Sequence, residues 1–282
     1  MTRVPELPEV EVVRRGLDTH LLGRSLDQIV VEDSRSLKRH LAGPQHFIDR
    51  LSGRQVVAIN RRGKYLWWTL DDGATVVVHL GMSGQVLISD AKSEHRHVRL
   101  WFVLDSGQVV SFVDQRIFGG MFVDEHDPPA AIVHIALDPL DPDFDRDGFV
   151  ARLSAKSVGI KKVLLDQNMV SGIGNIYADE ALWRAKLHYA QPANTLAREQ
   201  ALALLDHARD VMMQALDQGG TSFDSLYVNV NGESGYFSRS LEAYGRAGEP
   251  CSRCGTPMVR ETFMNRGSHF CPTCQKFRSL NE

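Results

Sequence analysis

The chain has 282 residues, with 32 Lys+Arg against 35 Asp+Glu and a formal net charge of −3. This length suits one large domain or two of ordinary size, and a hydrophobic content of 43% is that of a globular protein. No stretch has the ~18 apolar residues of a membrane span, and the first residues lack the apolar segment of a secretory signal. A membrane protein, a secreted mini-protein, a collagen and a disordered tail are excluded, and we expect a cytoplasmic protein.

The pattern of apolar residues changes from one helix to a series of short strands. At the start, apolar residues recur at helical spacing: Val10, Val13, Leu17 and Leu21. Pro8 suits the first turn of this helix, and Gly23 marks its expected end. From Leu26 to about Val123, turn dipeptides such as Asp72-Gly73 separate short apolar runs, a pattern typical of a β-sandwich. The predicted strands are Gln55–Asn60, Tyr65–Leu70, Thr75–Leu80, Gln85–Ser89, Val98–Leu104, Gln108–Val113 and Gly120–Val123.

The second half of the chain follows an acidic, proline-rich linker. Five aspartates and one arginine lie between Asp138 and Asp147, and prolines interrupt regular structure there. Four segments beyond the linker are predicted to be helical: Phe149–Leu153, Lys161–Met169, Ile176–Leu187 and Ala197–Gln218. We therefore expect an N-terminal β-sandwich domain (1–128), a linker (129–148), a helical domain (149–241) and a cysteine-rich unit (242–276).

The four cysteines form two short pairs, Cys251-x-x-Cys254 and Cys271-x-x-Cys274, separated by 16 residues. This spacing predicts one tetrahedral thiolate site for a structural Zn²⁺. Disulfides are the alternative, which a reducing cytoplasm disfavours. Between Cys251 and Arg278 there are five basic residues and one acid, so this end can bind phosphates despite the negative total charge.

Several blocks in this order resemble the formamidopyrimidine-DNA glycosylase (Fpg/Nei) family. The blocks are Pro5–Leu17, Arg61–Leu66, His79–Gly84, Asp114–Gly120, Ser171–Ala178 and the four-cysteine unit. The resemblance covers nearly the whole chain. It implies an α+β fold, in which a β-sandwich flanked by helices precedes a helix–two-turn–helix domain and a C-terminal β-hairpin zinc finger.

The resemblance also implies a function. Similar enzymes are bifunctional glycosylase/AP lyases that excise oxidised purines, chiefly 8-oxoguanine and formamidopyrimidines, from damaged double-stranded DNA. They then cleave the abasic strand by β,δ-elimination. We expect a monomer, associated with the nucleoid of a bacterial cell. The alternatives are an endonuclease VIII-like enzyme for oxidised pyrimidines and a non-catalytic, zinc-dependent protein that binds damaged DNA.

By match to the family, four residues are catalytic. Pro5 is the nucleophile, which forms an iminium with C1′ of the sugar, and Glu6 is the neighbouring acid/base. Lys64 contacts the phosphate beside the lesion and donates a proton in β-elimination, and Arg266 holds phosphates and donates one in δ-elimination. Read without the family, Glu6 also suits a helix N-terminus and Lys64 a solvated charge run, while Glu9 supports the start of the helix.

Other residues map to positions that contact DNA. Met82, Arg116 and Phe118 fill the void left by a base that leaves the duplex, although Met82 or Phe118 alone also suits a core. We assign Ile117 no role. The remaining matched positions are His79, His97, Lys156 and Asn175. The polar segment Gly220–Tyr236 resembles a lid over the flipped base.

Four residues, Met1-Thr2-Arg3-Val4, precede the expected nucleophile. With them attached, the nitrogen of Pro5 is a tertiary amide, which cannot attack a sugar carbon. A valine codon of the GTG type can initiate translation as Met, and a Met before proline is readily removed. We therefore expect the active chain to begin at Pro5; the alternative is another amine, such as Lys64.

Overall fold

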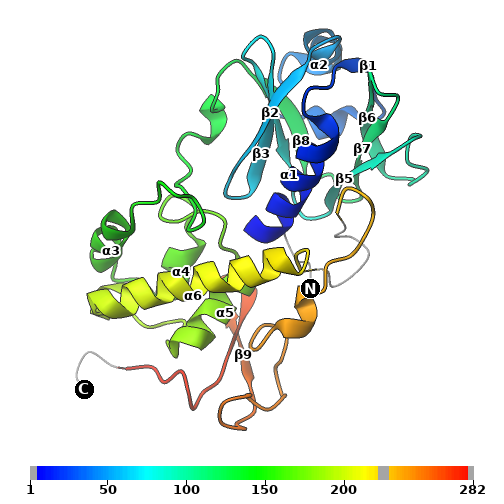
Figure 1. The fold of residues 1–282 in the computed structure, drawn as a ribbon. Helices are drawn as coiled ribbons and strands as arrows, with labels where there is room; N and C mark the ends of the chain where they lie inside the picture. The colour runs from blue at the N-terminus through cyan, green and yellow to red at the C-terminus, as the bar shows by residue number, and fades with distance from the viewer. Residues whose placement is uncertain (1–4, 222–228, 279–282) are drawn as a thin grey trace. The chain divides into compact units, whose positions relative to one another are not determined.

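The structure is a computed structural model, which describes residues 5–221 and 229–278. Met1–Val4 and the centre of the expected lid (222–228) lie outside the described residues. The chain divides into two compact units (Figure 1). The N-terminal unit comprises residues 1–134 and 216–236, and the C-terminal unit comprises residues 135–215 and 237–282.

The described part of the N-terminal unit contains two four-stranded antiparallel sheets, as the short apolar runs separated by turns predict. One sheet has the order β2-β3-β4-β8: Val56–Arg62, Tyr65–Leu70, Thr75–His79 and Gly120–Asp124. The other has the order β1-β6-β7-β5: Leu26–Val31, Val98–Leu104, Val109–Asp114 and Gly84–Ser89. Buried residues of both sheets form one core cluster, in which the rings of Trp68 and Phe102 meet edge to face at 5.3 Å. The predicted β-sandwich is confirmed.

Helix α1 (Leu7–Leu21) begins near the predicted position and buries its apolar face, including Val10 and Leu17, against this core. Helix α2 (Gly43–Leu51) was not predicted. It precedes the first predicted strand, in a region where only strands were expected, and it buries Phe47 and Leu51, too short an apolar pattern to stand out in the sequence. A 3₁₀ turn, Ser34–Leu37, precedes it, and another, Ala130–Ile132, follows the sheets.

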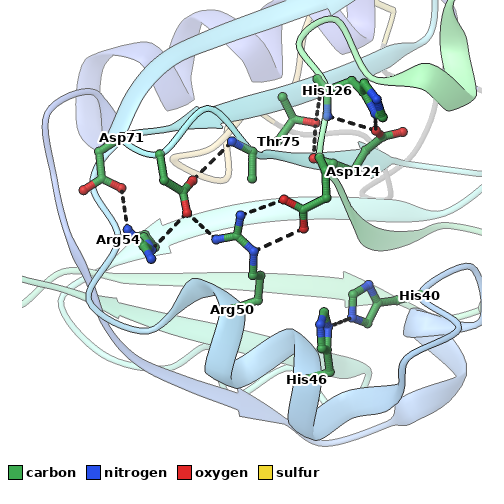
Figure 2. A network of polar contacts seen from close by, with 11 residues as sticks. His40, His46, Arg50, Arg54, Asp71, Thr75, Asp124 and His126 are labelled. Carbon is green, nitrogen blue, oxygen red and sulfur yellow. Dashed lines mark hydrogen bonds and ion pairs between the residues drawn. The ribbon is translucent and has the colours of Figure 1, made fainter.

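Polar contacts attach α2 to the sandwich (Figure 2). The guanidinium of Arg50 pairs with Asp72, in the turn between β3 and β4, and with Glu125, which follows β8; its Nη2 lies 2.8 Å from Glu125 Oε2. Before the helix, His40 Nδ1 accepts from the backbone N–H of Val123 at 3.3 Å. These ion pairs and hydrogen bonds join segments far apart in the sequence.

Residues 229–236 belong to the N-terminal unit, although they follow the helices of the other unit in the chain. Val230 is buried in the sandwich core, and its carbonyl accepts from Ile88 N–H at 2.8 Å. A Cβ on Gly16 would lie 2.4 Å from Val230 Cγ2, so only glycine in α1 leaves room for this anchor.

The C-terminal unit is built from helices and one hairpin. Its helices are α3 (Arg146–Ser154), α4 (Ile160–Leu165), α5 (Asn175–Ala185) and α6 (Arg198–Asp217), whose last two residues fall in the N-terminal unit. Short 3₁₀ turns occur at Ala193–Thr195 and Phe237–Ser240. Strands β9 (Val259–Phe263) and β10 (Arg266–Phe270) form an antiparallel hairpin. No helix within the described residues is long and apolar enough to cross a membrane.

Two helix boundaries in this unit differ from the sequence prediction by three residues or more. Helix α3 begins earlier, because the carboxylate of Asp145 caps it by accepting from Gly148 N–H at 2.8 Å. Helix α4 ends earlier, at Leu165, because the Asp166 backbone turns out of the helix and its side chain accepts from Asn168 N–H.

Candidate active site and metal centre

The carboxylate of Glu9 makes two hydrogen bonds at the start of α1. Pro5 and Glu6 are buried at this helix N-terminus. Glu9 Oε2 accepts from the backbone N–H of Glu6 at 2.9 Å, one half of a capping box. Glu9 Oε1 accepts from the backbone N–H of Thr221 at 2.8 Å. The side chain of Glu9 therefore joins the first turn of α1 to Thr221, the residue immediately before segment 222–228.

Lys64 lies in the tight turn between β2 and β3, as the sequence predicts. Arg61 holds this turn, since its Nη1 donates to the carbonyl of Gly63 and its Nε donates to Glu11 Oε2 in α1 at 2.9 Å. Burial would raise the pKa of Glu11, but hydrogen bonds from Arg14 and Arg61 outweigh burial and lower the pKa below its usual value. The ionised Glu11 thus ties the Lys64 turn to the helix that begins beside Pro5.

His79 ends β4, and its ring lies against Tyr65 with the centroids 4.6 Å apart. Burial, and then the charges of Arg39, Lys64 and Lys38, lower the pKa of His79 to about 4. The imidazole is therefore neutral at physiological pH.

Met82 and the segment Arg116–Phe118 lie in turns at the ends of strands, as the sequence predicts. The side chain of Phe118 is 47% exposed, and the guanidinium of Arg116 lies 4.9 Å from its ring centroid. Ile117, to which the sequence gives no role, has a φ of 57°, and its carbonyl accepts from Lys38 Nζ at 3.1 Å. Backbone conformation, more than side-chain chemistry, distinguishes this residue.

His97 lies among arginines on the N-terminal unit. Arg96 Nε donates to its Nε2 at 3.0 Å, and Arg99 Nη2 lies 3.3 Å from its Nδ1. Desolvation and the charges of Arg96 and Arg99 lower the pKa of His97. Two arginine side chains therefore contact the imidazole.

The C-terminal unit holds the other predicted residues. Arg266 is the first residue of β10, at the predicted hairpin tip, and Asn175 is the first residue of α5. Asn175 Nδ2 donates to the carbonyl of Gly267 at 3.0 Å, which joins the start of α5 to the hairpin beside Arg266. Lys156 is exposed between α3 and α4.

Lys161, which no sequence motif marks, also holds this hairpin. Its Nζ donates to the Gly267 carbonyl at 3.2 Å and pairs with Asp179 at 2.6 Å, and both side chains are fully buried. A buried ion pair of this kind needs its full set of partners, because a lone buried charge is costly. The sequence signal is a lysine among the apolar residues of α4.

The four cysteines converge on one site. Cys251 and Cys254 precede β9, Cys271 and Cys274 follow β10, and their sulfur atoms all lie within 4.8 Å of one another. None of the four forms a disulfide, so the disulfide alternative fails. Four sulfur ligands fit one structural Zn²⁺ and leave no coordination position for a reacting water. The ion stiffens a hairpin with a small core of its own.

That small core joins the zinc site to α5. It contains Trp183, Met258 and the buried Cys251 and Cys271. The guanidinium of Arg253 stacks 3.6 Å from the Trp183 ring centroid and donates to the Trp183 carbonyl. The metal site therefore holds the hairpin, and with it Arg266, on the helical part of this unit.

Family models match three successive parts of the chain. The N-terminal domain of formamidopyrimidine-DNA glycosylase matches residues 4–121, and the H2TH domain of the same enzyme matches residues 135–226. A zinc finger found in FPG and IleRS matches residues 248–276.

Curated relatives match over almost their full length. The formamidopyrimidine-DNA glycosylase of Mycolicibacterium smegmatis is 58% identical over 278 residues, which cover 96% of this chain and 97% of that protein. The enzyme of Nocardioides sp. is 56% identical over 279 residues, with 96% and 94% covered.

Solved structures agree. The MutM (Fpg) protein of Thermus thermophilus has a TM-score of 0.86 and 36% identity, and the match covers 98% of this chain and 100% of that one. The Lactococcus lactis Fpg in complex with DNA containing an abasic site has a TM-score of 0.87 and 33% identity, with 96% and 99% covered. The predicted family, fold class and zinc finger are confirmed.

Removing one zinc ligand should loosen the C-terminal unit. In Cys271→Ser, we expect loss of stoichiometric zinc and of DNA affinity together, because the hairpin that carries Arg266 loses its support. Metal content by elemental analysis and binding to a lesion duplex check this, with Ser252→Ala, beside a ligand, as the control. A metal-free wild type that retains full activity would contradict a structural zinc.

The low pKa of His79 predicts a pH-dependent stability. Below its ordinary pKa of about 6.5, the unfolded chain takes up a proton that the folded one refuses until about pH 4, so acidification favours unfolding. By pH 5.5 this proton uptake lowers the free energy of unfolding by up to about 1.4 kcal/mol. His79→Gln should therefore lose less stability between pH 7.5 and 5.5 in urea unfolding than wild type. The exposed His134→Gln should behave as wild type; equal slopes for all three proteins would refute the assignment.

Proposed function

The chain belongs to the formamidopyrimidine-DNA glycosylase family and is a DNA glycosylase and AP lyase of base-excision repair, and we propose that it acts on oxidised purines in duplex DNA. The substrates are chiefly 8-oxoguanine and formamidopyrimidines. The observation that carries the proposal is the start of α1, where Pro5 and Glu6 are buried together at a helix N-terminus that Glu9 fixes.

Pro5 supplies the nucleophile when it is the first residue of the active chain. An α-amine has a pKa of about 7.7–8.0 against about 10.4 for lysine, so much more of it is unprotonated near pH 7. Its nitrogen forms a bond to C1′ of the sugar as the bond from C1′ to the oxidised base breaks. The amine then loses its proton, the C1′–O4′ bond breaks as O4′ takes up a proton, and an iminium results. The iminium draws electrons from the C2′–H bond, so a proton can leave C2′ and the 3′ phosphate departs in β-elimination.

Glu6, Lys64 and Arg266 manage protons and phosphates in this scheme. The Glu6 carboxyl is buried beside Pro5, where a group exchanges protons with the sugar oxygen and the leaving base. Lys64 binds the phosphate beside the lesion and donates a proton during β-elimination. Arg266 forks the flanking phosphates from the hairpin tip and serves the later δ-elimination.

The remaining residues bind the distorted duplex. A base that leaves the stack costs a few kcal/mol, and Met82 and Phe118 occupy the gap as apolar wedges while Arg116 hydrogen-bonds the orphaned partner base. Phosphate and groove contacts come from His79, His97, Lys156 and Asn175. Segment Gly220–Tyr236 closes over the extruded base.

The proposal also covers the division of the chain into domains. The catalytic sandwich spans 1–128, the linker 129–148, the helix–two-turn–helix domain with its lid 149–241, and the zinc finger 242–276. The enzyme works as a monomer on chromosomal DNA in the bacterial cytoplasm.

Borohydride trapping tests the proposed nucleophile. Wild-type protein with 8-oxoguanine duplex should become covalently linked to DNA, since borohydride reduces an iminium to a stable amine. Pro5→Gly should excise the base far more slowly, whereas Pro44→Gly, the same change at the exposed start of α2, should match wild type. Sequencing the trapped protein should find Pro5 at its amino terminus. Trapping through Lys64 instead would overturn the assignment, and preference for oxidised pyrimidines would favour an endonuclease VIII-like enzyme.

Salt dependence tests the proposed phosphate contact of Arg266. Each phosphate contact contributes about 0.9 to the negative slope of log K against log salt concentration. Arg266→Ala should flatten that slope by roughly one unit. The control is Arg198→Ala, which removes an exposed arginine of the same unit that pairs with Asp147 and should leave the slope unchanged. A slope equal to that of wild type in Arg266→Ala would remove this residue from the interface.

A further inference from the structure

A fully buried carboxylate lies where the two proposed void-filling loops meet. Asp114, the last residue of β7, is 0% exposed. Its Oδ1 accepts from Ser83 Oγ at 2.5 Å and from the backbone N–H of Arg116 at 3.1 Å. Its Oδ2 accepts from the backbone N–H of Gly119 at 2.8 Å. One side chain thus binds both ends of the loop that presents Arg116 and Phe118.

Ser83 brings the other loop into the same network. It is buried and directly follows Met82 in the chain. While its hydroxyl donates to Asp114, the hydroxyl oxygen accepts from the N–H of Arg116 at 3.1 Å. The residue after the proposed Met82 wedge is therefore bonded to the backbone of the residue proposed to read the orphaned base.

The backbones of the two loops also touch. Gly81 has a φ of +63°, and a Cβ there would lie 2.3 Å from Gly119 N and 2.5 Å from the carbonyl carbon of Phe118. Neither backbone can yield at such distances, so this approach requires glycine. Contact and hydrogen bonds together leave the loops little freedom to move separately.

The main chain of Asp114 extends the network to a third segment. Its N–H donates to the carbonyl of His97 at 3.0 Å, and its carbonyl accepts from Arg99 Nε at 2.7 Å. Four proposed DNA-contacting residues therefore lie on segments joined through this one aspartate.

We propose that Asp114 is a positioning residue for damage recognition, which locks the Met82 loop and the Arg116–Phe118 loop into one rigid unit before DNA arrives. This inference rests on the proposed function. Phe118 is largely exposed, and a side chain that must enter the base stack binds better when its backbone is already ordered. Asp114 itself is buried and acts through the loops rather than by touching DNA.

The arrangement requires a carboxylate. In Asp114→Asn, one position of the side chain becomes an NH₂ donor. If the amide oxygen stays at Oδ1, the NH₂ faces the N–H of Gly119; if it stays at Oδ2, the NH₂ faces the N–H of Arg116 and the hydroxyl of Ser83. Either orientation sets a buried NH₂ against a buried N–H: that of Gly119 in the first case, and that of Arg116, which keeps only the Ser83 oxygen as acceptor, in the second.

The rates of base excision and of abasic nicking, together with hydrogen exchange of the backbone, test the proposal. An abasic site has no base to extrude, so the loops matter less there. We expect Asp114→Asn to slow single-turnover excision of 8-oxoguanine by roughly ten- to a hundredfold, the cost of an unmet buried hydrogen bond, and to slow abasic nicking much less. Ser83→Ala should act in the same direction. Hydrogen exchange without DNA should quicken in both segments, 81–84 and 115–119.

Asp124→Asn is the matched control. This carboxylate lies at the opposite end of β8 from Gly120 and also orders a turn, accepting from the backbone N–H groups of His126 and Ala131. It should leave the excision-to-nicking ratio and the exchange of 81–84 and 115–119 unchanged.

Equal losses of excision and nicking in Asp114→Asn, or faster exchange confined to 115–119, would overturn the proposal. If Asp114→Asn does not fold, as judged by its thermal unfolding, Ser83→Ala decides by the same criteria. Failure of the wild type to excise any oxidised purine would instead refute the proposed function. The exchange measurement needs no substrate, so it still decides whether Asp114 joins the loops.

Discussion

One carboxylate, that of Glu9, accepts hydrogen bonds from two backbone N–H groups that lie far apart in the chain, those of Glu6 and Thr221. The first bond caps α1 and orients the Pro5–Glu6 pair. The second fixes Thr221, the residue immediately before segment 222–228. Because the helix N-terminus carries a partial positive charge, a carboxylate there is stabilised as it performs both tasks. The first turn of α1 and the position of Thr221 thus depend on the same side chain.

Charge is distributed to match a polyanionic substrate, although the net charge is negative. Acidic side chains at the site are engaged with cations or backbone donors: Glu11 holds Arg61, which supports the Lys64 turn, and Asp114 binds N–H groups of the loop that presents Arg116. They order the cationic loops through buried contacts. Local arrangement, more than total charge, therefore determines which surfaces suit phosphates.

In the C-terminal unit, a metal site orders the hairpin that carries Arg266. Its hairpin is too small to order itself by apolar burial, so four thiolates around one Zn²⁺ supply the stability. Packing of Trp183 with the ligand cysteines and the buried Lys161–Asp179 pair then join the hairpin to α4 and α5. Arg266 stands at the tip of an element stiffened from both sides.

The sequence by itself determined the local features: α1, most of the strands, the zinc ligands, and the turns that carry Lys64, Met82 and Arg116. Each of these depends on periodicity, turn chemistry or short spacing, which neighbouring residues record. The structure alone revealed α2, the anchoring of Val230 against Gly16, the shared use of Glu9, and the buried roles of Lys161 and Asp114. These depend on which distant segments pack together, and an isolated lysine or aspartate in a sequence does not show whether a partner lies beside it. Long-range packing, which buries a polar group and so obliges it to find partners, made those assignments.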